Sequence, residues 1–292
     1  MSDLVPAGTI VVGLDGSHSS GRALGWAIDQ AVLEHRPLTL AHAVVPEGAV
    51  WLDASGNDHR VGVETTRTEG HDLLNRAREE IDRRAPGLEV HEVLRVADPR
   101  DLLLALSEDA AMVVVGSRGR GPVRSLLLGS VGVAVTRHAR CPVVVHRPGD
   151  PSRVRHGIVV GVDATPAART TLEFAYRQAS LRDLPLTVVH CYWSVGGPAA
   201  AEQVAADAQE QRLLLAETIS GMAEKFPDVH VHTQVARGLV DDVLVRAGEE
   251  THLVVVGGHH GGAASEVLFG SVASSVVEHA TCPVAVVPLT RF

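Results

Sequence analysis

Glycine, serine and arginine gather in the stretch GSRGRGPVRSLLLGS, which covers residues 116–130. Gly116, Gly119 and Gly129 are spaced as Gly-x2-Gly-x9-Gly, and Ser130 follows at once. Glycines let backbone N–H groups approach an anion without an intervening Cβ, and Ser130 adds a hydroxyl. A helical pattern, SVGVAVTRH, begins at Ser130, and a helix N-terminus attracts anions through its unpaired N–H groups. The residue types and their spacing therefore predict a phosphate site.

The positive charge for such a site would come from arginine. Lys225 is the one lysine of the chain, so a P-loop of the GxxxxGK[ST] type is absent. Arg118, Arg120 and Arg124 lie in or beside the glycine stretch and can supply charge-assisted hydrogen bonds instead. The alternative is purely structural: the glycines only make turns, and Ser130 only caps a helix.

Short apolar runs rich in Val, Ile and Leu alternate with helical patterns along the first half of the chain. The apolar runs are at 9–14, 38–44, 88–94, 112–115 and 143–146. The helical patterns are at 19–35, 64–84, 99–110 and 130–138. Runs that are apolar throughout are typical of strands buried on both faces. The alternation predicts an α/β domain with a doubly wound, five-stranded parallel sheet and helices on both faces.

Two loops of this predicted sheet carry polar residues. The first apolar run ends in the segment GLDGS at 13–17, and the fourth run ends at Gly116. Ligands of doubly wound sheets bind beyond the carboxyl ends of the strands, where the strand order reverses. If these two strands are neighbours, both loops face one crevice.

The sequence also repeats itself. Five segments of the first half recur in the second, namely 10–17 at 158–165, 38–43 at 186–191, 113–121 at 254–262, 127–131 at 268–272 and 138–145 at 279–286. The first two pairs are offset by 148 residues and the last three by 141, so the second half lacks seven residues. The polar segment PEGAVWLDASGNDHR, at 46–60, is the expected location of that difference. The repeat predicts two domains of one fold, 1–148 and 157–292, joined by a linker at 149–156.

Composition limits the classes of function. The 292 residues are 45% hydrophobic, enough for two medium domains, and the formal net charge is −9. Non-specific binding to nucleic acid or anionic membrane needs a basic surface, so we expect neither. No apolar run reaches the ~18 residues of a membrane span, and the first residues lack a signal-peptide pattern. Three cysteines are too few for a disulfide framework, so we expect reduced thiols and a cytoplasmic protein.

Taken in order, GLDGS after the first strand, AHA on the second, the spaced glycines after the fourth and CPVVV on the fifth resemble the universal stress protein family. The resemblance covers both copies of the repeat. It implies the strand order 3-2-1-4-5 and an ATP-binding domain, with Mg²⁺ as a companion of the phosphates. It also implies a pseudo-dimer of the two copies, which can pair through their last strands, and a homodimer of tandem chains.

Positions of the first copy that match the family pattern are the expected nucleotide ligands. A carboxylate suits this role at Asp15, because it accepts the hydrogen bonds that ribose and adenine groups donate. Around adenine and ribose the resemblance places Leu14, Asp15 and Ala43, with Gly13 beside them. Around the phosphates it places Gly116, Gly119, Gly129, Ser130 and Val131, with Arg118 beside them.

The second copy departs from this pattern in its glycine loop, GGHHGGAASEVLFGS at 257–271. His260 stands in place of Gly119, and His259, Gly261 and Ser265 stand in place of Arg118, Arg120 and Arg124. Glu266 in place of Ser125 adds a negative charge. We expect a second site that is weaker or absent, unless the two histidines or backbone amides replace the arginines as donors. Its residues would be Gly161, Val162, Asp163, Cys191, Gly257, Gly270, Ser271 and Val272.

Other clusters of reactive residues fit structural roles better. A His-x2-Cys pair recurs at 138–141 and 279–282, but further ligands are missing nearby, so we expect no metal and read the cysteines as structural. We expect His42, and the corresponding His190 of the second copy, to be polar core residues near the crevice rather than catalysts.

The resemblance and the residues together leave three functions open. The first is an ATP-binding regulatory module of the stress response, in which occupancy, mainly in the first domain, biases conformation or assembly. The second is an enzyme with slow ATP hydrolysis or adenylate chemistry, for which the sequence offers no catalytic residue. The third is a ligand-free interaction scaffold. The intact glycine pattern of the first copy favours the regulatory module.

Overall fold

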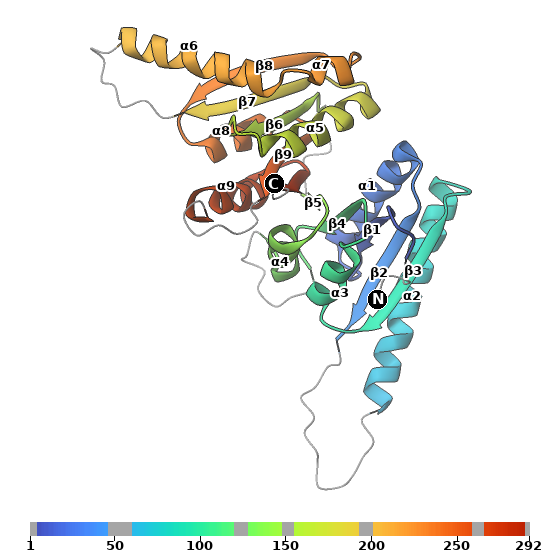
Figure 1. Cartoon of the computed structure of the whole chain (residues 1–292). Helices are drawn as coiled ribbons and strands as arrows, with labels where there is room; N and C mark the ends of the chain where they lie inside the picture. Colours follow the sequence, from blue (N-terminus) through green and yellow to red (C-terminus); the bar gives the residue numbers. More distant parts are fainter. Residues whose placement is uncertain are drawn as a thin grey trace. The chain divides into compact units, whose positions relative to one another are not determined.

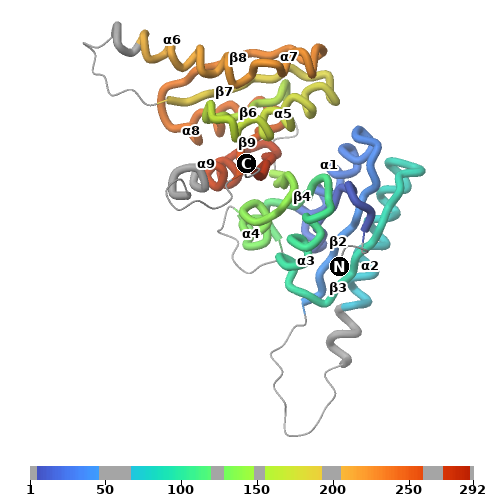
Figure 2. Tube along the Cα trace, in the orientation of Figure 1, coloured from blue at the N-terminus to red at the C-terminus, as the bar shows by residue number. Residues whose placement is uncertain are grey.

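The computed structural model describes residues 5–45, 60–119, 128–147, 155–192, 201–258 and 266–289. Only the backbone is described at 60–66, 201–204 and 266–271, inside three helices. The chain divides into two compact units, Met1–Cys141 and Pro142–Phe292. The colour gradients of Figures 1 and 2 follow the chain through the first unit and then the second.

Strands and helices alternate in the first unit as the apolar pattern predicts. Its elements are β1 (Ile10–Gly13), α1 (His18–Glu34), β2 (Leu38–Val44), α2 (Arg60–Arg84), β3 (Val90–Val96), α3 (Pro99–Leu106), β4 (Met112–Gly116) and α4 (Ser130–His138). The strand order is β3-β2-β1-β4, and the paired strands run parallel. Because β1 has β2 on one side and β4 on the other, the order reverses there, and the two polar loops become neighbours.

Helices cover both faces of this sheet, as predicted (Figure 1). Helix α1 packs with α2, and α3 packs with α4. Helix α1 buries one face, as the spacing of its apolar residues predicts. The residues of this face, Ala23, Ala27, Ile28 and Ala31, are at most 1% exposed. The strands β1 and β4 are buried on both faces, which explains their continuous apolar runs.

The second unit repeats the pattern and shows the complete strand order. Its elements are β5 (Val143–His146), β6 (Ile158–Val162), α5 (Ala168–Arg182), β7 (Leu186–Tyr192), α6 (Ala201–Thr218), α7 (Met222–Lys225), β8 (Val231–Arg237), α8 (Val240–Ala247), β9 (Leu253–Gly258), α9 (Glu266–His279) and β10 (Val284–Pro288). The order β8-β7-β6-β9-β10 is 3-2-1-4-5 in the numbering of one copy, which confirms the expected fold.

The last strands of the two copies pair, as their sequences predict. Strand β5 lies in the second unit and runs antiparallel to β10, with Val143 opposite Val286 and Val145 opposite Val284. The compact units therefore divide at Cys141. The domain bounds 1–148 and 157–292, with the linker at 149–156, stay a prediction.

The seven-residue difference between the copies falls where it is expected. Strands β2 and β7 start at 38 and 186, an offset of 148, whereas helices α2 and α6 start at 60 and 201, an offset of 141. The difference therefore arises between strand and helix, although residues 46–59 themselves lie outside the described part. Among the described residues, no helix is long and apolar enough to cross a membrane.

Candidate functional site

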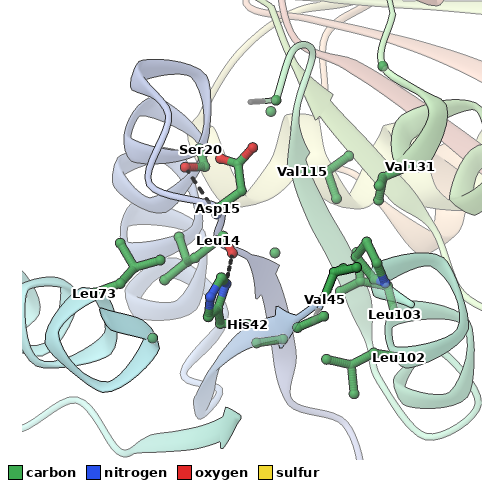
Figure 3. A pocket seen from close by; sticks show the side chains of 18 of the residues that line it. Leu14, Asp15, Ser20, His42, Val45, Leu73, Leu102, Leu103, Val115 and Val131 are labelled. Carbon is green, nitrogen blue, oxygen red and sulfur yellow. Dashed lines mark hydrogen bonds between the residues drawn. The ribbon is translucent and has the colours of Figure 1, made fainter. Parts of the chain in front are cut away.

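A pocket of about 1290 Å³ opens beyond the carboxyl ends of β1, β2 and β4 (Figure 3). Main-chain and side-chain atoms from both polar loops line it, together with residues of α2, α3 and α4. All ten residues expected to bind nucleotide in the first copy are among the lining residues, namely Gly13, Leu14, Asp15, Ala43, Gly116, Arg118, Gly119, Gly129, Ser130 and Val131. The pocket thus brings together the ends of β1 and β2, the loop after β4 and the start of α4.

Asp15 is held by the turn that joins β1 to α1. The N–H of Ser17 donates to Oδ1 of Asp15 at 2.9 Å, and Gly16 takes the left-handed conformation that this turn needs, with φ of +76°. Ser17 is the N-cap of α1 and accepts from the N–H of Ser20 at 3.1 Å. Asp15 itself is partly exposed and points toward the pocket (Figure 3).

The glycine loop after β4 is docked on the start of α1. The Ser17 hydroxyl donates to the carbonyl oxygen of Arg118 at 3.3 Å, and the N–H of Arg118 donates to Oγ of Ser19 at 3.3 Å. A Cβ at Gly116 would lie 2.7 Å from the carbonyl carbon of Ser19. Gly116 is therefore needed for packing whether or not a ligand binds. The structural role considered for the glycines thus applies at this position.

Helix α4 presents its N-terminus to the pocket. Its N-cap, Gly129, makes no side-chain capping bond, and the N–H of Gly129 donates to the Ser117 carbonyl oxygen at 3.0 Å. The first N–H groups of a helix have no intrahelical partner, and here they belong to Ser130, Val131 and Gly132, all of which line the pocket. This is the arrangement that favours an anion. Arg118 adds a cation at the same rim, whereas Arg120 and Arg124 lie outside the described residues.

Sequence reasoning missed the contribution of two helices to the pocket. Helix α2 lines it with Glu69, Gly70, Asp72, Leu73 and Arg76, and α3 lines it with Pro99, Leu102 and Leu103. The α2 residues recur at helical spacing, so the signal was present, but periodicity alone does not say which face meets a ligand.

His42 lines the same pocket from β2, near the crevice as expected. Its Nδ1 lies 2.7 Å from the carbonyl oxygen of Leu14 (Figure 3). This bond ties the end of β2 to the end of β1 across the sheet.

The second copy keeps part of this arrangement. Asp163 follows β6 and accepts at Oδ1 from the N–H and the hydroxyl of Thr165, at 3.1 and 2.7 Å. Gly161 makes room for Leu244, as Gly13 does for Leu103 in the first copy. Cys191 is partly buried at the end of β7.

The helix that follows the second glycine loop starts earlier than its counterpart. Helix α4 begins at Ser130, but α9 begins at Glu266, so Gly270 and Ser271 lie inside the helix rather than at its N-terminus. Backbone N–H groups in a helix interior are already bonded four residues back. Gly257 lies at the end of β9 and Val272 inside α9, while His259 and His260 lie outside the described residues.

The cysteines have structural environments. Cys141 and Cys282 are buried, and burial raises the pKa of the Cys141 thiol to about 12 and that of the Cys282 thiol to about 11. In the described part of the chain no group of three or more His, Cys, Asp or Glu residues could hold a metal ion. The burial of Cys141 and Cys282 agrees with the reading of these cysteines as core residues.

The chain is similar to known proteins over nearly its whole length. A family model described as the universal stress protein family matches residues 7–147 and 155–288. A universal stress protein of Mycolicibacterium smegmatis is 33% identical over 294 aligned positions, covering 95% of this chain and 96% of the relative. One from Mycobacterium tuberculosis is 34% identical and covers 95% of both chains. The crystal structure of a universal stress protein from Archaeoglobus fulgidus covers 97% of both chains at 20% identity, with a TM-score of 0.70, so it shares the fold.

Proposed function

The chain belongs to the universal stress protein family, and from that premise we propose that its first copy binds ATP and acts as a nucleotide-responsive regulatory module. The observation that carries the proposal is the shared pocket: ten residues selected from sequence converge on one cavity at the switch point of the sheet. Nucleotides bind at this position in doubly wound sheets.

The chemistry around the pocket suits the parts of a nucleotide. The first N–H groups of α4, those of Ser130, Val131 and Gly132, and the N–H of Gly119 suit phosphate, and Arg118 offers positive charge. Asp15 is an acceptor for ribose hydroxyls. Leu14, Leu102 and Leu103 give an apolar wall for a base. Mg²⁺ would accompany the phosphates, with its remaining ligands supplied by water.

We propose that the second copy binds ATP weakly or not at all. The early start of α9 supports this, because the N–H groups near Gly270 and Ser271 are engaged inside the helix. The replacement of three loop arginines supports it as well, since each lost charge-assisted contact weakens binding by about 1.5–3 kcal/mol. The nucleotide is then held mainly by the first domain.

Two further parts belong to the proposal. The chain acts in the cytoplasm, which the three free thiols support. Tandem chains form homodimers, which size-exclusion chromatography with light scattering tests directly. A mass of one chain, about 30.8 kDa, would contradict the dimer.

Calorimetric titration of the full chain with ATP tests the proposed site, with Gly129→Asp as the variant. Gly129 has φ of −71° and ψ of 156°, open to any residue, and a Cβ there meets nothing nearer than 3.8 Å. Aspartate is a favoured N-cap, so the variant should fold while its carboxylate repels phosphate. The matched control is Gly21→Asp, which adds the same charge on the exposed side of α1, where nothing lies within 4 Å of an added Cβ.

We expect Gly129→Asp to lose measurable ATP binding and Gly21→Asp to keep the wild-type affinity. Equal affinity of all three proteins would refute phosphate binding at α4. A wild-type chain that does not bind ATP would favour the scaffold function instead.

A further inference from the structure

The two copies hold a histidine in the same way at the end of their second strands. Nδ1 of His42 lies 2.7 Å from the carbonyl oxygen of Leu14, and Nδ1 of His190 lies 2.9 Å from the carbonyl oxygen of Val162. A carbonyl oxygen can only accept, so in both cases Nδ1 carries the proton and donates it. The other ring nitrogen, Nε2, of the neutral ring is then an acceptor.

The copies differ in what faces that Nε2 atom. Nε2 of His190 lies 2.9 Å from the atom placed as Oε1 in the side-chain amide of Gln211 on α6, and His190 is only 6% exposed. An amide oxygen cannot donate to an accepting Nε2, so we assign the Gln211 amide in the opposite orientation, with its NH2 group facing and donating to Nε2. His42 has no such partner among the described residues, and it lines the pocket.

The residue that corresponds to Gln211 in the first copy is Gly70. Helices α2 and α6 align at the offset of 141, which also superimposes the buried leucines Leu74 and Leu215, each 1% exposed. A Cβ built at Gly70 would lie 3.0 Å from Cδ2 of His42, the ring atom bonded to Nε2. Gly70 therefore leaves open the space beside His42 that Gln211 fills beside His190.

We propose that Gln211 is a built-in occupant of the base-binding position of the second copy, and that His42 with Gly70 keeps this position open for adenine in the first. This inference rests on the proposed nucleotide site. The exocyclic amino group of adenine would donate to Nε2 of His42, as the amide NH2 of Gln211 donates to Nε2 of His190. Guanine would meet the same atom with its O6 acceptor, so adenine is preferred.

The strand next to each histidine, β3 or β8, indicates which second substitution would make room for a glutamine at position 70. Leu94 pairs with His42 across β2 and β3, and Val235 pairs with His190 across β7 and β8. A Cβ at Gly70 would lie 2.8 Å from Cδ1 of Leu94, whereas the smaller valine stands at that position in the second copy. The double variant Gly70→Gln/Leu94→Val therefore copies the second arrangement into the first with room for the new side chain.

The test is calorimetric titration of the full chain with ATP. We expect Gly70→Gln/Leu94→Val to bind at least about tenfold more weakly than the single variant Leu94→Val, whose changed side chain does not line the pocket. Thermal melting followed by circular dichroism verifies that the double variant is folded. Equal affinity in a folded double variant would overturn the inference.

A second measurement needs no change at Gly70. Wild-type protein is titrated with AMP and with purine riboside 5′-monophosphate, which lacks the amino group. We expect a preference for AMP of about tenfold or more that falls toward one in His42→Leu. Equal affinities in wild type would overturn the inference while leaving the proposed site intact. A wild-type chain that binds neither AMP nor ATP would overturn the site and the inference together.

Discussion

A Cβ added at Gly119 would lie 2.6 Å from the Oδ2 oxygen of Asp15. The loop after β4 and the turn after β1 are thus in direct contact, although 104 positions separate the two residues (119 − 15). A side chain at position 119 would therefore have to displace the carboxylate of Asp15. The phosphate half and the ribose half of the proposed site therefore depend on one another. A substitution in one loop should change the position of side chains in the other.

The substitution Gly119→Ala tests this dependence. The new methyl group would displace the end of the Asp15 side chain rather than backbone, so the protein should fold normally. We expect ATP affinity to fall by about tenfold, or about 1.4 kcal/mol, in a calorimetric titration. Gly21→Ala is the control, because its added methyl meets open space. An unchanged affinity for Gly119→Ala would show that the contact has no bearing on binding.

Gly116→Ala should act on stability instead. Its Cβ would lie 2.7 Å from the carbonyl carbon of Ser19 and 2.8 Å from that carbonyl's oxygen, and backbone atoms cannot move aside without shifting α1. We expect urea unfolding of nucleotide-free protein to show a loss of about 1–3 kcal/mol. If the variant is as stable as wild type without nucleotide, Gly116 is not a packing glycine.

The helices α3 and α8 differ at their N-caps. Asp98 caps α3 and accepts from the N–H of Arg100 at 2.8 Å, whereas the repeat-related Leu239 offers α8 no capping group and is 53% exposed. Asp98→Ala should therefore destabilise the protein by about 1 kcal/mol, and Leu239→Ser should stabilise it by a similar amount. Thermal melting of each variant measures both effects, and a lower melting temperature for Leu239→Ser would contradict the account.

The capping contribution of Asp98 has a predictable pH dependence. Hydrogen bonds from Arg100 lower the pKa of the Asp98 carboxyl to about 2. A lowered pKa in the folded state means that the contribution is complete above the ordinary pKa near 4 and is lost as the pH falls through 2. The melting difference between wild type and Asp98→Ala should stay constant from pH 7 to about 5 and shrink below that. A difference that disappears already at pH 5 would contradict this assignment.

Thiol reactivity tests the cysteine environments. With its pKa raised to about 12, roughly one Cys141 thiol in ten thousand is ionised at pH 8, so alkylation by iodoacetamide should be very slow. Cys282 should behave likewise, while Cys191, only partly buried, should react first. Peptide mass spectrometry after timed alkylation gives the order, and all three should react once the protein is unfolded. Faster modification of Cys141 than of Cys191 in folded protein would contradict these cysteine environments.

Much of the fold could be predicted because its signals are local. Continuous runs such as IVVG at 10–13 indicate buried strands, and the repeat supplies a second, independent copy of each element. The convergence of Asp15 and Gly119 was also predictable, since the carboxyl ends of neighbouring parallel strands meet at one edge of a sheet.

Features set by tertiary packing could not be predicted. That Gly70 borders His42 depends on how α2 rotates over the sheet, which periodicity leaves open. The start of α9 at Glu266 was equally hidden, because the aligned Gly270 and Ser271 have the residue types that open α4 in the first copy. The difference in N-capping between α3 and α8 could not be predicted either, because Asp98 and Leu239 are recognised as N-caps only once the helix bounds are known.

Native mass spectrometry of freshly purified protein, repeated after saturation with ATP, tests the central claim most directly, because it counts nucleotides per chain. The account predicts one adenine nucleotide on each chain, and none on Gly129→Asp. Two nucleotides per chain that bind with equal affinity as ATP is added would contradict the unequal copies. A chain that carries none, even at saturation, would contradict nucleotide binding itself.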